Sequence, residues 1–94
     1  MSREERVSRD GVRRATLAAL QRAADFEIVH LALPPFGLGA GNLDVEDSAS
    51  AMLEAVRRHA AEMPRARWPR RITFVVENEE ERRAFVAALP VEEA

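Results

Sequence analysis

Residues 27–49 read EIVHLALPPFGLGAGNLDVEDSA, and this stretch decides the fold. It opens with an apolar run, 27–33, that is rich in branched side chains and ends at two prolines, a pattern typical of a strand buried on both faces. Asp44, followed three residues later by a second aspartate, is a variant of the capping box that places a helix start near Val45. The order of strand, glycine-rich loop and helix predicts the first half of a βαβ unit.

The second half of that unit follows in the sequence. Apolar positions keep helical spacing from Val45 to about Glu62, and Pro64 prevents the helix from continuing. Residues 72–76, ITFVV, are the strongest β segment of the chain. Two strands joined by such a helix lie parallel with a right-handed crossover, so we expect a βαβ unit spanning residues 27–76.

An amphipathic helix is expected before this unit. Apolar residues recur with helical spacing over 7–24, most regularly over 12–24. Gly11 weakens the first turns, because glycine costs about 1 kcal/mol against alanine inside a helix. Residues 1–11 are therefore expected to be a frayed or extended part of that helix.

A further helix is expected after the unit, because Asn78 and Glu81 repeat the capping pattern. Its inner face would carry Phe85, Ala88 and Leu89. The fold class predicted is thus α/β, in the order helix, strand, helix, strand, helix, with one parallel βαβ unit.

Composition bounds the organisation and the partners. The chain has 94 residues, no cysteine, 47% apolar and 32% charged residues, and a net charge of −2. This length allows one domain, 1–94. Because acidic and basic residues are interleaved, the chain as a whole has no electrostatic attraction to nucleic acid or to a membrane. Disulfides and cysteine-based metal sites are excluded, no apolar stretch is long enough to cross a bilayer, and the cytoplasm is the expected location.

Two parallel strands alone are a poorly stable sheet, because their outer edges leave backbone donors and acceptors unpaired. We therefore expect a homo-oligomer, such as a homodimer, or a complementing chain that completes the sheet or covers its surface.

The glycine-rich loop is the candidate site. Such a loop, between the carboxyl end of a parallel strand and a helix N-terminus, converges backbone N–H groups on an anion, and the helix dipole adds attraction. The alternative is a loop that is rich in glycine merely to turn. The candidate ligand-binding residues are Gly37, Leu38, Gly39, Ala40, Gly41 and Asn42.

This stretch resembles the macro domain family, whose last third runs helix, apolar strand, proline, glycine loop, helix, strand, helix. The family pattern of proline, two small or apolar residues, Gly, a hydroxyl residue, Gly, a variable residue and Gly falls without gaps on 34–41. The resemblance implies that residues 37–42 wrap the diphosphate and distal ribose of ADP-ribose. Leu38 replaces the hydroxyl residue and Asp44 replaces a common proline. The aromatic residue that often stacks on adenine has no counterpart at 77–78.

The resemblance covers about residues 12–89, which is only the C-terminal half of a macro domain. In the family the other half supplies a second phosphate loop and the residues that position the catalytic water of ADP-ribosyl hydrolases. We therefore assign no catalytic residue and no cofactor, and expect a truncated module that is not an enzyme alone. The alternative function is a self-associating interaction module that binds no nucleotide.

Other polar residues have structural interpretations. His30 is expected to be a packed, hydrogen-bonded strand residue and His59 a solvated cation at a helix C-terminus. Arginines around Trp68 could grip a nucleic-acid strand, but we expect a solvated connection with Trp68 capping the core. The acidic residues at 77–81 could hold a hard cation, but they are ordinary at a helix start, and no metal site is assigned.

Overall fold

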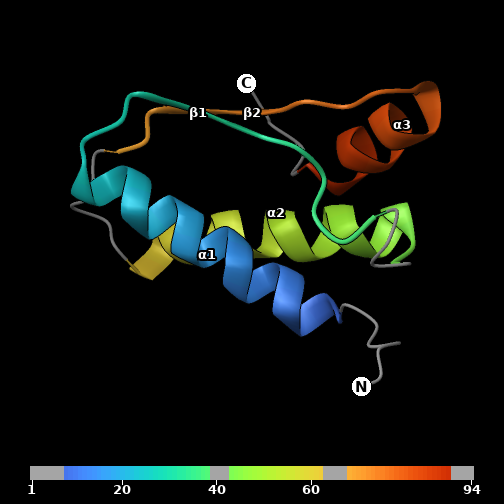
Figure 1. Ribbon diagram of the computed structural model, residues 1–94, viewed down its shortest axis with the longest axis horizontal. Coiled ribbons are helices and arrows are strands. Elements are labelled where there is room, and N and C mark those ends of the chain that lie inside the picture. The colour runs from blue at the N-terminus through green and yellow to red at the C-terminus, as the bar shows by residue number, and fades with distance from the viewer. Residues whose placement is uncertain (1–7, 39–42, 63–67, 90–94) are drawn as a thin grey trace, which may run out of the picture.

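The fold is a small α/β unit, seen in a computed structural model that describes residues 8–38, 43–62 and 68–89 (Figure 1). The two strands pair in parallel, with His30 opposite Arg71 and Leu33 opposite Phe74, so the helix that connects them makes the expected βαβ unit. The predicted fold class is confirmed. The elements are α1 (Arg9–Asp25), β1 (His30–Leu33), α2 (Val45–Glu62), β2 (Arg71–Phe74) and α3 (Glu79–Ala88).

One apolar core lies between the helices and a single face of the sheet. Val12 of α1, Met52 of α2 and Phe85 of α3 are at most 4% exposed and belong to the same cluster. The inward-facing side chains of the strands pack against it, and the rings of Phe74 and Phe85 lie 5.1 Å apart. Since α1 and α2 lie on the same side of the strands (Figure 1), the core is closed on that side only.

The expectation of a strand buried on both faces is wrong for the described residues. Exposure alternates along β1, where His30 and Ala32 are exposed, Leu31 is half-buried and Leu33 is buried. The apolar run 27–33 favoured two covered faces, but all three helices pack against one face. The other face of the sheet is open.

Strand β1 also begins three residues later than expected, because α1 ends in a Schellman motif. The N–H of Glu27 donates to Ala24 O (3.1 Å) and the N–H of Ile28 donates to Ala23 O (2.9 Å). Glu27 has a φ of 54° and occupies the left-handed position that usually takes glycine. Residues 26–29 therefore form the turn between α1 and β1 rather than the start of the strand.

Helix α1 begins at Arg9, with Ser8 as its N-cap. The Ser8 hydroxyl accepts a hydrogen bond from Gly11 N (2.9 Å), so Gly11 lies within the first helical turn. Residues 9–11 are thus helical, whereas 1–7 lie outside the described part of the chain.

Helix α3 has the predicted start. Asn78 Oδ1 accepts from Glu81 N (2.8 Å), and Glu81 Oε1 accepts from Glu77 N (2.8 Å), which satisfies two backbone donors in the manner of a capping box. Phe85 is buried and Ala88 half-buried, as expected. Leu89 is not on the inner face: it is the C-cap residue and 46% exposed, because the helix ends at Ala88. None of the helices described is long and apolar enough to cross a membrane.

Candidate functional site

The loop between β1 and α2 lies where the sequence predicts an anion site. It leaves the carboxyl end of β1 and returns at Leu43, two residues before α2 begins at Val45. The N–H of Leu43 donates to Gly37 O (3.0 Å), which closes the loop at its base. The bond thereby ties the first part of the loop to the residues that lead into α2.

Two buried side chains of α2 hold the start of this loop. The Ser48 hydroxyl donates to Phe36 O (2.7 Å), and the N–H of Phe36 donates to Met52 Sδ (3.4 Å). Ser48 and Met52 are both fully buried, at 0% exposure. Both backbone polar groups of Phe36 are therefore bound to the helix that follows the loop.

Position 37 needs glycine for two reasons: its backbone conformation and the lack of room for a side chain. Its φ is +88°, in the region that side chains disfavour. An added Cβ would lie 3.0 Å from Val12 Cγ2 and 3.1 Å from Leu43 Cδ2. Glycine is therefore required at position 37, where the loop packs against the core, whatever the loop binds.

Only part of the predicted site falls within the described residues. Gly37 and Leu38 are half-buried at the base of the loop. The remaining predicted ligand-binding residues lie outside the described part of the chain: Gly39, Ala40, Gly41 and Asn42. The structure thus places the base of the candidate site and gives no contact for its tip.

We expect Ser48→Ala to destabilise the protein by about 1–3 kcal/mol, because the carbonyl of the half-buried Phe36 loses its donor. The measurement is urea unfolding followed by circular dichroism. Ser50→Ala is the matched control, because Ser50 lies on the same helix, is half-buried and accepts only a surface hydrogen bond from Arg9. An equal cost for the two variants would contradict the anchoring role of Ser48.

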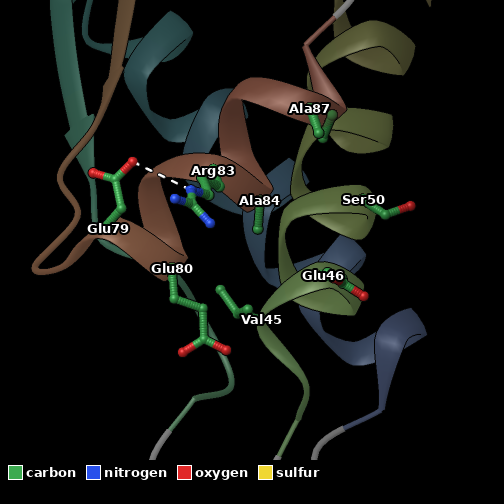
Figure 2. A pocket seen from close by; sticks show the side chains of 9 residues that line it. Val45, Glu46, Ser50, Glu79, Glu80, Arg83, Ala84 and Ala87 are labelled. Carbon is green, nitrogen blue, oxygen red and sulfur yellow. Dashed lines mark hydrogen bonds and ion pairs between the residues drawn. The ribbon is translucent and has the colours of Figure 1, made fainter.

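A groove with a volume of about 670 Å³ lies between α2 and α3 (Figure 2). Its floor is made of small or apolar side chains, and its rim carries carboxylates. None of the predicted loop residues lines it. The lining residues are Val45, Glu46, Ser50, Glu79, Glu80, Arg83, Ala84, Ala87 and Ala88.

The groove and the first turn of α2 are electrostatically negative. A hydrogen bond from Arg82 holds the pKa of Glu79 below its usual value, and Arg83 pairs with the same carboxylate (3.4 Å), as Figure 2 shows. Glu46 and Glu80, in contrast, have no ion pair within the part of the chain that the structure describes. This negative charge opposes an anion at the neighbouring loop.

The two histidines differ from expectation. His30 is hydrogen-bonded, through Nε2 to Thr73 Oγ1 (2.7 Å), but it is exposed rather than packed. His59 is not solvated: it is 8% exposed, its Nε2 lies 3.5 Å from Trp68 O, and its Nδ1 has no partner among the described residues. His59 faces inward because it lies one helical turn from Ala55, on the buried face of α2.

Trp68 is half-buried, and the guanidinium of Arg70 lies 5.0 Å from its ring centroid. This cation–π contact occupies one face of the aromatic ring that a nucleic-acid base would need for stacking. Arg65 and Arg67 of the same arginine group lie outside the described residues.

Sequence reasoning missed Ser48 as the residue that anchors the loop. Its spacing in the sequence could have identified it. Ser48 lies four residues before Met52 and three after Val45, so it is a polar residue on the apolar side of the predicted helix. A polar residue at such a position needs a partner, and the nearest unsatisfied backbone is that of the loop.

The chain is similar to longer proteins of mycobacteria. No family model matches the sequence. Uncharacterized proteins of Mycobacterium bovis and of two Mycobacterium tuberculosis strains are each 39% identical to it over 75 residues, which is 80% of this chain. The match covers 19–20% of each relative. The chain therefore spans about a fifth of the length of the mycobacterial relatives it matches.

Proposed function

We propose that this chain is a macro-domain-like module whose loop 37–42 binds the diphosphate of ADP-ribose, with the rest of the site supplied by another chain or by a longer protein. The single observation that carries the proposal is the placement of the loop. It lies between the carboxyl end of a parallel strand and the N-terminus of an 18-residue helix, and a hydrogen bond closes its base. This arrangement suits anion binding by backbone N–H groups.

Binding would depend on the backbone rather than on side chains. Leu38 has no hydrogen-bonding group in its side chain, and the N–H of Leu43 is already bound to Gly37 O. The donors for a phosphate would therefore be other N–H groups of the loop. A loop of this kind can recognise the diphosphate but has no group here that would select adenine.

The negative charge around the loop limits what the chain can do alone. Asp44, Glu46 and Asp47 all lie at the start of α2, and Asp47 is partly balanced by Arg9 at 3.7 Å. A dianionic ligand needs cations nearby, and a completing partner would have to bring them. No described residue is placed to activate water, so we propose binding without catalysis by this chain alone.

Titration of ADP-ribose into the ¹⁵N-labelled chain tests the proposal. We expect weak, saturable shifts of the amide signals of Gly37, Leu38 and Leu43, which pyrophosphate reproduces and adenosine does not. The intact Mycobacterium tuberculosis relative, titrated by calorimetry, is expected to bind ADP-ribose more tightly. Failure of ADP-ribose to bind either protein at millimolar concentration would refute the proposal.

The unpaired outer edges of the two-stranded sheet favour a second candidate, a self-association module that uses the loop only as a turn. It predicts a stable dimer that is indifferent to nucleotides. Light scattering in the titration buffer separates the two candidates, because a monomer at micromolar concentration contradicts the second.

A further inference from the structure

The open face of the sheet is defined by alternating side chains. His30 lies beside Arg71 and Ala32 beside Thr73 in the register of the strands, and all four are exposed. The N–H of Val75 donates to Leu33 O (2.8 Å), which continues the pairing one residue past β2, and Val75 is 51% exposed. We call these residues the outer face: His30, Ala32, Arg71, Thr73 and Val75.

A face of this kind is normally covered. Parallel sheets occur with helices on both faces, because the crossover connections leave helices there and the strands are apolar. Here α1 and α2 lie on the inner side (Figure 1), and none of the described helices packs on the outer face. Val75 and Ala32 are the apolar centre that a covering helix would bury.

The charge of the outer face indicates which side chains a partner packed against it would carry. It carries the Arg71 guanidinium and the His30 imidazole, which the Thr73 hydroxyl holds at 2.7 Å, and it has no carboxylate. A second copy packed face to face would bring two of these cationic faces together, which is unfavourable. A segment complementary to the outer face would therefore have apolar side chains along its centre and carboxylates along one side.

We propose that the outer face docks an amphipathic helix of a partner protein, with an aliphatic stripe over Ala32 and Val75 and a carboxylate paired to Arg71. In the mycobacterial relatives about four fifths of the polypeptide lies outside the match, which is ample length for such a helix. The inference rests on the proposed need for a completing partner and is independent of ADP-ribose.

The test uses two synthetic helical peptides of about 18 residues, long enough to be partly helical alone. Both have the same Leu and Ala stripe, which is flanked by Glu in one peptide and by Lys in the other. Titrated into the ¹⁵N-labelled chain without nucleotide, the Glu peptide is expected to shift the amide signals of His30, Ala32, Thr73 and Val75. It should bind about tenfold more tightly than the Lys peptide, a difference of about 1.4 kcal/mol. The net charge of the chain, −2, works against this preference, so it cannot come from nonspecific attraction.

Two variants locate the docking surface. Val75→Asp is expected to abolish binding of the Glu peptide, whereas Val86→Asp, at a valine of α3 with nearly equal exposure (53%), should leave it unchanged. Arg71→Glu should reverse the preference toward the Lys peptide. Shifts centred on α3, equal affinities for the two peptides, or no shifts at millimolar peptide would each overturn the proposal. Self-association of the chain that Val75→Asp abolishes would assign the face to a second copy and overturn it as well.

Discussion

Replacing Met52 by alanine is expected to destabilise the protein by about 2–5 kcal/mol, the range for removing a large aliphatic side chain from a core. Met52 is 0% exposed and packs in the cluster that joins Val12 of α1 and Phe85 of α3. Its truncation would open a cavity where all three helices meet. Total stability of native domains is about 5–15 kcal/mol, so the loss would be a large share of it.

The Met52 variant also tests the support of the loop, because Met52 Sδ accepts the N–H of Phe36 (3.4 Å). Met52→Leu is the matched control: it keeps the volume, removes the sulfur and is expected to cost less than about 1.5 kcal/mol. Urea unfolding followed by circular dichroism measures both variants. A Met52→Ala cost no larger than that of Met52→Leu would show that the core closes around the missing atoms.

Replacing Gly37 by alanine is expected to destabilise the protein by about 2–5 kcal/mol. A side chain at φ +88° carries a backbone penalty of about 1–2 kcal/mol. The new Cβ would also lie 3.0 Å from Val12 Cγ2 and 3.1 Å from Leu43 Cδ2, and overpacking of a core adds a penalty of about 1–3 kcal/mol. The same variant should displace Leu43 and so remove the ADP-ribose-dependent shifts expected at the loop.

Gly11→Ala is the matched control for this prediction. Gly11 lies in the first turn of α1 with no positive φ, and its new Cβ would lie 3.2 Å from Ser8 Oγ. The gain of about 0.5–1 kcal/mol from alanine in a helix offsets this close contact, so stability should change by less than about 1 kcal/mol. Thermal and urea unfolding compare the two substitutions, and equal effects would argue against backbone strain at Gly37.

Local signals in the sequence were sufficient for the helices. Helix α2 runs from Val45 to Glu62 as predicted, because proline and aspartate mark its two ends. Asp44 directly precedes the helix, and its carbonyl accepts the first helical hydrogen bond, from Ser48 N (3.0 Å). The start of the helix was therefore predicted correctly, whereas no hydrogen bond to the Asp44 carboxylate is seen among the described residues.

The strands and the site depended on tertiary contacts that local patterns do not contain. The turn at Glu27 was missed because a glutamate there occupies a position where glycine is the usual signal. Exposure of the outer face was missed because an apolar run does not say how many helices will cover it. The base of the loop was placed correctly, but the role of Ser48 depends on a partner twelve residues earlier, at Phe36.

The pairing of β1 with β2 has a consequence for the order of folding. His30 and Thr73, which meet across the sheet, are 43 residues apart in the chain, whereas each helix needs only its near neighbours. Closing so long a segment is entropically costly, so α1 and α2 can form and collapse before the strands align. During that interval the strand edges are unpaired and able to join with other chains.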